Sequence, residues 1–269
     1  MNRPIKIAVC ILFAVIMYLI LAEAVAPWVN LPDVGNVGFT MVFVLFALTH
    51  CLAIEGLRFT AQFFAVSAFV SFWMEEIGVR TGLIFGFYHY SDSLGVKVGH
   101  VPVLIPLAWF MMIYPSWRVG LALLRGIDTR SLSGLTALAA FSALVMTGWD
   151  AVMDPGMSIV HNWVWEHGGA YFGVPRKNYI GWLLTTFLIY CLAGLSRRNL
   201  KRQLNTTTTF ISLPVIVYSF FAFRYVLSNR FPALQVVALF SMAMPGWLAL
   251  LLIYSNNKCG LVVDAIADM

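Results

Sequence analysis

Apolar side chains form long continuous runs along this chain, and polar residues gather in the intervals between the runs. Eight runs have about the 20 residues that an α-helix needs to cross a bilayer. The alternation over ~10-residue segments that a membrane β-barrel requires is absent. We expect spanning helices at roughly 5–24, 37–54, 60–77, 102–124, 133–152, 179–196, 209–227 and 233–254. The pattern therefore predicts an all-α fold, a polytopic integral membrane helical bundle with about eight (7–8) transmembrane helices, in a single membrane domain over residues 1–269.

The composition agrees with a membrane protein. Charged residues make up 11% of the chain and hydrophobic residues 61%, with a mean hydropathy of +0.84, whereas soluble domains carry about 25% charged residues. The net charge is +5, but the basic residues lie mainly at the ends of the apolar runs, where they set membrane orientation. We therefore expect no nucleic-acid partner.

The distribution of basic residues favours a cytoplasmic N-terminus, because cytoplasmic loops carry an excess of Lys and Arg. That orientation places ten basic residues inside and five outside. The inner set is Arg3, Lys6, Arg58, Arg125, Arg130, Arg197, Arg198, Lys201, Arg202 and Lys258, and the outer set is Arg80, Lys97, Arg176, Lys177 and Arg230. The sequence thus predicts a multi-pass protein of the cytoplasmic (inner) membrane.

Two connections, about 78–101 and 153–178, are much longer than the others. They follow the third and fifth expected helices, so they emerge on the same face of the membrane. Both are rich in glycine, aromatic residues and acids. We expect the two connections to meet and to close over one cavity.

Glu75 and Glu76 end the third expected helix. A carboxyl group within a membrane segment costs about 2.5–3.5 kcal/mol and normally faces protein or water. One reading puts both groups at the interface, with one of them paired to Arg80. The other makes one of them a buried general acid, since a carboxyl in an apolar pocket can stay protonated.

Asp150 and Asp154 end the fifth expected helix, and their spacing of four places them on one face. We expect Pro155 to stop this helix. Asp154 could cap a short following helix from Met157 to Trp165, or the two carboxylates could hold Mg²⁺ or position a water molecule.

Aromatic residues crowd the same two segments, more densely than an interfacial belt requires. Rigid aromatic walls beside acids suit a long apolar substrate and a developing carbocation. The expected substrate-binding residues are Trp73, Phe85, Tyr88, Tyr90, Trp109, Trp163, Trp165, Tyr171 and Asn178. The histidines and cysteines have no metal-binding spacing, so we expect no metal and no cofactor.

Two ordered motifs in these segments resemble a known family. The first is E-x-x-G-x-x-T-G-x-x-F-G-x-Y-x-Y from Glu75 to Tyr90, followed by LG and VPVLIPLAWFMM; the second is GWDAVMDPGM, followed by W-x-W and GGAYFGVPRKNYIGW. Together, over 73–118 and 148–183, they resemble the membrane carotenoid-biosynthesis proteins that include the γ-carotene hydratases and bisanhydrobacterioruberin hydratases. The resemblance implies a hydro-lyase that acts on a lipid-soluble carotenoid, in contact with membrane lipid and with other enzymes of carotenoid (isoprenoid) biosynthesis.

Hydration of a terminal double bond needs a proton donor, stabilisation of a tertiary cation and an oriented water molecule. Since Glu76 lies four residues before Arg80, we expect it to form an ion pair. That assigns the donor role to Glu75, with Asp150 orienting water or steadying the cation and Asp154 beside it. The alternatives are an intramembrane prenyltransferase or elongase that uses the DxxxD pair with Mg²⁺, and a carotenoid- or lipid-binding protein without catalysis.

Overall fold

The computed structural model describes residues 3–26, 28–198, 206–228 and 231–255. Four of the basic residues used to orient the chain, Lys201, Arg202, Arg230 and Lys258, lie outside these ranges. The rest of the expected pattern can be compared with the structure directly.

Within the described residues, seven helices are long and apolar enough to cross a membrane. They are α1 (Arg3–Val25), α2 (Gly35–Glu55), α3 (Leu57–Thr81), α5 (Leu132–Ile159), α6 (Arg176–Arg197), α7 (Thr208–Ser228) and the segment Pro232–Ser255. The last comprises α8 (Pro232–Ala238), a π-helical turn (Leu239–Ala243) and α9 (Met244–Ser255). The predicted class, a multi-pass α-helical membrane bundle, is confirmed.

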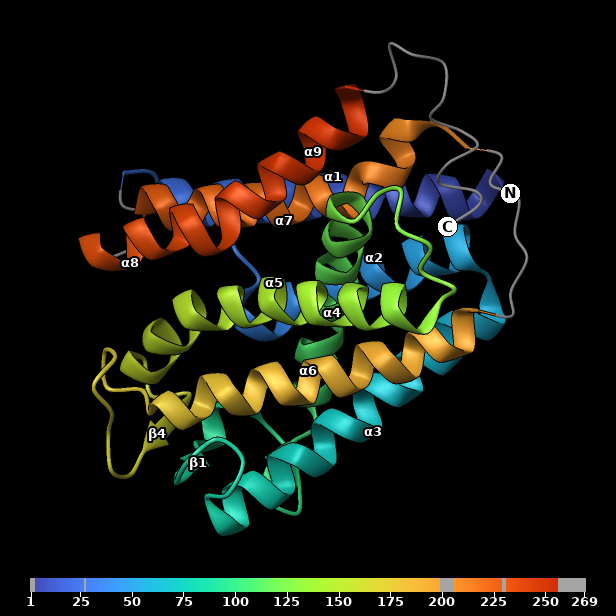
Figure 1. Cartoon of the computed structure of the whole chain (residues 1–269). Helices are drawn as coiled ribbons and strands as arrows, with labels where there is room; N and C mark the ends of the chain where they lie inside the picture. Colours follow the sequence, from blue (N-terminus) through green and yellow to red (C-terminus); the bar gives the residue numbers. More distant parts are fainter. Residues whose placement is uncertain (1–2, 27, 199–205, 229–230, 256–269) are drawn as a thin grey trace.

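The remaining long helix, α4 (Leu104–Leu123), differs from these seven. It contacts α2, α3, α5, α7 and α9, and Figure 1 shows it crossing the long axes of the other helices steeply near the centre of the molecule. Every residue from Trp109 to Ala122 is buried. Protein therefore surrounds α4, which explains how it tolerates Arg118 and Pro115 within an apolar run.

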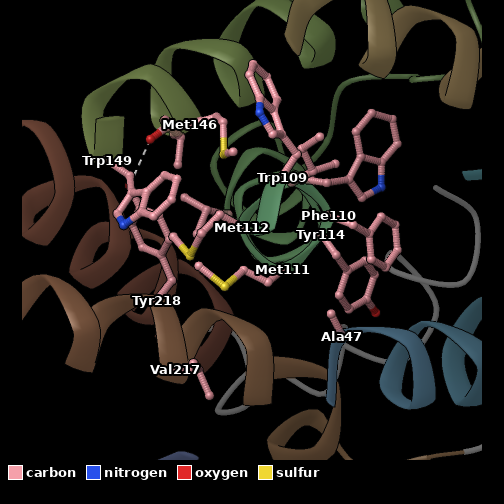
Figure 2. Close-up of a cluster of buried hydrophobic side chains, with 14 of the residues drawn as sticks. Ala47, Trp109, Phe110, Met111, Met112, Tyr114, Met146, Trp149, Val217 and Tyr218 are labelled. Carbon is pink, nitrogen blue, oxygen red and sulfur yellow. Dashed lines mark hydrogen bonds between the residues drawn. The ribbon is translucent and has the colours of Figure 1, made fainter. Parts of the chain in front are cut away.

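The centre of the core lies around α4. Figure 2 shows Trp109, Met112 and Tyr114 pointing outward from α4 in different directions. They meet residues of three other helices, labelled there as Ala47 of α2, Met146 and Trp149 of α5, and Val217 and Tyr218 of α7. Burial on all sides accounts for the absence of a polar stripe on this helix.

Helix α5 is longer than predicted, because it continues through Pro155 to Ile159. Proline lacks the N–H that would bond the carbonyl four residues earlier, which here belongs to Ala151. The Tyr171 hydroxyl donates to that carbonyl at 3.1 Å instead. The expected stop at Pro155 is wrong for this reason. The expected short helix from Met157 to Trp165 is also wrong, because α5 itself continues to Ile159 and residues 163–165 form a strand.

The two long connections meet, as predicted. Strand β1 (Tyr88–Tyr90) pairs antiparallel with β4 (Trp163–Trp165), with Tyr88 opposite Trp165 and Tyr90 opposite Trp163. A second small ribbon within the first connection pairs β2 (Lys97–Val98) with β3 (Val101–Pro102), after a 3-10 turn at Asp92–Leu94. The β1–β4 ribbon covers the ends of α3, α5 and α6 (Figure 1).

Candidate functional site

Glu75 lies near the C-terminal end of α3, and its buried carboxyl group accepts three hydrogen bonds. The hydroxyls of Tyr88 and Tyr90 both donate to Oε2, the second at 2.8 Å, and Trp109 Nε1 donates to Oε1 at 2.9 Å. Hydrogen bonds donated to a carboxylate stabilise its charged form. Glu75 is thus held as a fixed acceptor with both oxygens engaged.

The β1 strand explains how both tyrosines reach Glu75. Successive side chains of a strand point to opposite faces, so Tyr88 and Tyr90 point inward while His89 between them is exposed. Burial raises the pKa of both hydroxyls well above the ordinary value, and the charge of Glu75 raises it further. The two tyrosines therefore stay protonated and act as donors.

Asp150 and Asp154 of α5 project from one helix face, as their spacing predicts. Asn178 of α6 joins them, because its Nδ2 donates to Asp150 Oδ2 at 2.8 Å and to Asp154 Oδ2 at 2.7 Å. The indoles of Trp163 and Trp165 donate to Asp154 Oδ1 at 2.5 and 3.3 Å. Both oxygens of Asp154 are thereby engaged.

Asp150 differs from the other two buried carboxyls. Its Oδ1 is buried and has no hydrogen-bond partner among the described residues, and the residue is fully buried. A buried carboxyl oxygen without a donor is costly as an ion. The arrangement is suited to a group that carries a proton and can offer it to a bound molecule.

Three tryptophans stand beside these acids. Trp109 of α4 and Trp182 of α6 are stacked, with ring centroids 4.0 Å apart and an interplanar angle of 9°, and Trp149 meets Trp182 edge-on at 5.9 Å. Aromatic faces attract a nearby cation through their quadrupole. The wall is therefore both apolar and able to stabilise positive charge.

Glu75, Asp150 and Asp154 all line one cavity of about 140 Å³. Seven of the expected substrate-binding residues line it too: Phe85, Tyr88, Tyr90, Trp109, Trp163, Trp165 and Asn178. The two sequence motifs thus build a single site.

Three expected site residues lie elsewhere. Glu76 pairs with Arg80 at 2.6 Å, as predicted, and accepts from the His100 backbone N–H at 2.8 Å. Trp73 is 48% exposed on the outside of α3, and Tyr171 bonds to the α5 backbone and lines a different hollow. Successive helical residues point about 100° apart, so Glu75 and Glu76 cannot both face the cavity.

Other lining residues were not singled out from the sequence. Trp149 lies next to Asp150 within the motif GWDAVMDP, and Trp182 ends the second motif, so adjacency was a usable signal for both. Glu23 and Arg224 also line the cavity. Both are charged residues inside apolar runs, which is the usual mark of a functional position in a membrane protein.

The donor set does not favour a divalent cation at the DxxxD pair. The oxygens of Asp154 and one oxygen of Asp150 accept N–H donors from Asn178, Trp163 and Trp165, and such donors point positive charge at the place a cation would take. Within the described ranges no three His, Cys, Asp or Glu residues are grouped to hold a metal ion.

The fold and site define a multi-pass membrane protein with a buried cavity of carboxyls and aromatic rings. Residues 35–252 match the family described as carotenoid biosynthesis protein, and the chain belongs to this family. A bisanhydrobacterioruberin hydratase from Haloarcula japonica is 34% identical over 137 residues, which are 50% of this chain and 45% of the relative. The match thus spans about half the length of that curated relative. No solved structure matches the chain.

Proposed function

We propose that this protein hydrates a terminal carbon–carbon double bond of an acyclic carotenoid, giving a tertiary alcohol. One observation carries the proposal: a buried oxygen of Asp150 that has no partner among the described residues and a fully hydrogen-bonded Glu75 line the same aromatic cavity. The name of the hydratase relative supports the same reaction.

The reaction needs no reagent other than water. Asp150 gives its proton to the less substituted alkene carbon, and the π electrons form the new C–H bond. The other carbon becomes a tertiary cation. The oxygen of a water molecule then bonds to that carbon, and the proton it sheds returns to Asp150, so the acid is restored. General acid–base catalysis by such a group contributes typically 10²–10⁴-fold.

Glu75 and the tryptophans stabilise the cation in this scheme. Because both carboxyl oxygens of Glu75 are held by Tyr88, Tyr90 and Trp109, the group acts as a fixed negative charge. A preorganised charge in a water-poor site is worth more than the same charge in water. The stacked pair Trp109–Trp182 adds attraction through its ring faces.

Expression in a lycopene-producing bacterial host tests the proposal. We expect a new pigment that is heavier than lycopene by one or two molecules of water, and no such product with Asp150→Asn. Recovery of unchanged lycopene bound to the wild-type protein would instead support a non-catalytic carotenoid carrier.

Treatment of the membranes with EDTA separates hydration from Mg²⁺-dependent prenyl transfer. We expect alcohol formation to continue after chelation, because the proposed steps use only protons, water and fixed charge. Activity that disappears with EDTA and returns with Mg²⁺ would contradict hydration by these residues alone and favour a prenyltransferase.

A further inference from the structure

The cavity has a second polar end that the proposed reaction does not use. Glu23 near the end of α1, Asn36 at the start of α2 and Arg224 near the end of α7 line the same cavity as Glu75 and Asp150. Arg224 Nη1 lies 2.8 Å from Glu23 Oε2, and its guanidinium lies over the Tyr225 ring, 4.7 Å from the centroid. Ionisable residues within membrane helices typically mark paths for water, ions or substrates.

Exposure along the lining identifies this end as an opening. Asn36 is exposed to solvent, and no other lining residue in the described part of the chain is exposed to the same degree. The side chains of Glu23 and Arg224 are 29% and 23% exposed, whereas Asp150 is completely buried. Thr40 lies one turn after Asn36 on α2, also lines the cavity and is buried, so polar groups continue inward from the opening.

The opening lies on the side of the molecule that carries the two long connections. In Figure 1 the end of α1, the end of α7 and the strand β4 all lie toward the left of the bundle. The helix ends on this side include Asn36, Glu23 and Arg224, which are exposed or partly exposed. The cavity therefore extends from this exposed end to the buried Asp150.

We propose that Glu23, Asn36 and Arg224 form the mouth through which the reacting water enters the cavity from the aqueous phase. This inference rests on the proposed hydration and adds the source of its second reagent. The carotenoid is dissolved in lipid, whereas water must be drawn into a cavity walled by aromatic and aliphatic side chains. A fixed ion pair and an exposed amide supply hydrogen bonds to water at the entrance, where an apolar rim would repel it.

An ion pair that merely ties α1 to α7 would leave the same contacts, so the test must block the opening without breaking the pair. A bulky reagent attached to the thiol of Asn36→Cys blocks the opening, and the ion pair is unchanged because Asn36 is not a member of it. Asn30→Cys is the matched control: Asn30 lies in the connection that leads into α2, is exposed and does not line the cavity. Both proteins are placed in nanodiscs with lycopene in the bilayer and treated with a sulfonate-bearing methanethiosulfonate, which is charged and reaches only water-exposed thiols.

We expect the reagent to slow alcohol formation by Asn36→Cys about tenfold relative to its own untreated sample, as expected when a pore lining is obstructed. Dithiothreitol should restore the rate, and the amount of lycopene that copurifies with the protein should not change. Asn30→Cys should be labelled equally, by mass, and keep its rate. If Asn36→Cys is inactive before treatment, two tryptophan variants replace the two cysteine variants. Asn36→Trp fills the mouth without a reagent, and Asn30→Trp is its control.

Three outcomes would overturn the water mouth. Labelled Asn36→Cys could retain its full rate, the thiol could resist the charged reagent, or labelling could release the bound lycopene, which would make this opening the carotenoid entrance. Failure of the untreated wild-type protein to form any alcohol would count against the proposed hydration itself, and the two failures are thereby distinct.

Discussion

At the scale of single residues, the three buried carboxyls of the cavity differ in their partners. Glu75 and Asp154 have every oxygen bonded to a donor, whereas Asp150 has one oxygen without a partner among the described residues. The sequence alone favoured Glu75 as the proton donor, by pairing Glu76 with Arg80. The contacts favour Asp150 in that role and Glu75 as the charge that faces the cation, and the two assignments predict different responses to mutation.

Asp150→Asn should lower the rate of alcohol formation by about 10²–10⁴-fold, because an amide has no transferable proton. The loss alone does not separate the two assignments, so binding of a cation mimic completes the test. A lycopene analogue with an ammonium group in place of the terminal tertiary carbon should bind Asp150→Asn as well as wild type. It should bind Glu75→Gln about tenfold or more weakly, because a buried opposite charge is lost.

The reverse pattern, with weaker binding of the ammonium analogue to Asp150→Asn alone, would restore Glu75 as the donor. Thr185→Val, a similar-sized change at a buried position of α6 that does not line the cavity, serves as the control for general damage to the bundle.

Glu76→Gln should affect stability rather than chemistry. The carboxylate of Glu76 accepts from Arg80 and from the His100 backbone, and Arg80 is more than half exposed, so solvent screens the ion pair. We expect a loss of about 1 kcal/mol in the free energy of unfolding, seen as a lower melting temperature in detergent. The turnover of the protein that remains folded should stay near the wild-type value, and a large fall in turnover would assign Glu76 to the site.

At the scale of elements, the short β1–β4 ribbon determines which side chains reach the acids. The alternation of β1 turns Tyr88 and Tyr90 inward to Glu75, and β4 brings Trp163 and Trp165 to Asp154. A shift of one residue in this pairing would turn the tyrosines outward and His89 inward. The register of six residues is therefore as important for the site as the long helices beneath it.

Val164→Pro should disturb this ribbon, because proline cannot donate to the ladder and restricts the backbone. Val164 pairs with His89 at the centre of the ribbon. We expect most of the hydration activity to be lost while the helical circular dichroism is unchanged, since the change lies outside the helices. Val164→Thr keeps a strand-forming side chain and should remain active; equal activity of the proline variant would show that the ribbon is dispensable.

At the scale of the whole molecule, α4 differs from the other long helices because protein surrounds it. Seven described helices can cross a membrane by length and composition, and α4 lies among them in contact with α2, α3, α5, α7 and α9. The two long connections still share one face, because they pair through β1 and β4. The excess of basic residues on one side predicts which face of the membrane this is.

Cysteine labelling from each side of sealed vesicles tests the orientation. Val96 and Phe172 are exposed in the two long connections, and Arg58 is exposed in the first turn of α3. We expect Val96→Cys and Phe172→Cys to react from the outer side and Arg58→Cys from the cytoplasmic side, by the excess of inner basic residues. Reaction of the first two from opposite sides would contradict the shared face, and a uniform reversal would place the N-terminus outside.

The sequence by itself determined the features that depend on local surroundings. Long apolar runs specify helices because the backbone in lipid must satisfy its own hydrogen bonds, and the expected bounds agree with the helices to within a few residues except at the end of α5. The spacing of Glu76 and Arg80 specified their ion pair, and the spacing of Asp150 and Asp154 put them on one face. The order of the expected spans, with 102–124 counted as one of them, put the two long connections on one face, and β1 and β4 do pair.

Only the tertiary structure decided which of these groups share the cavity and with what partners. Apolarity alone does not separate a helix surrounded by lipid from one surrounded by protein, so α4 read as an ordinary span. The bond from Tyr171 to the Ala151 carbonyl, which carries α5 past Pro155, joins residues 20 positions apart. Arg224 meets Glu23 from the other end of the chain. Such contacts depend on how helices pack in three dimensions, which no local pattern of residues encodes.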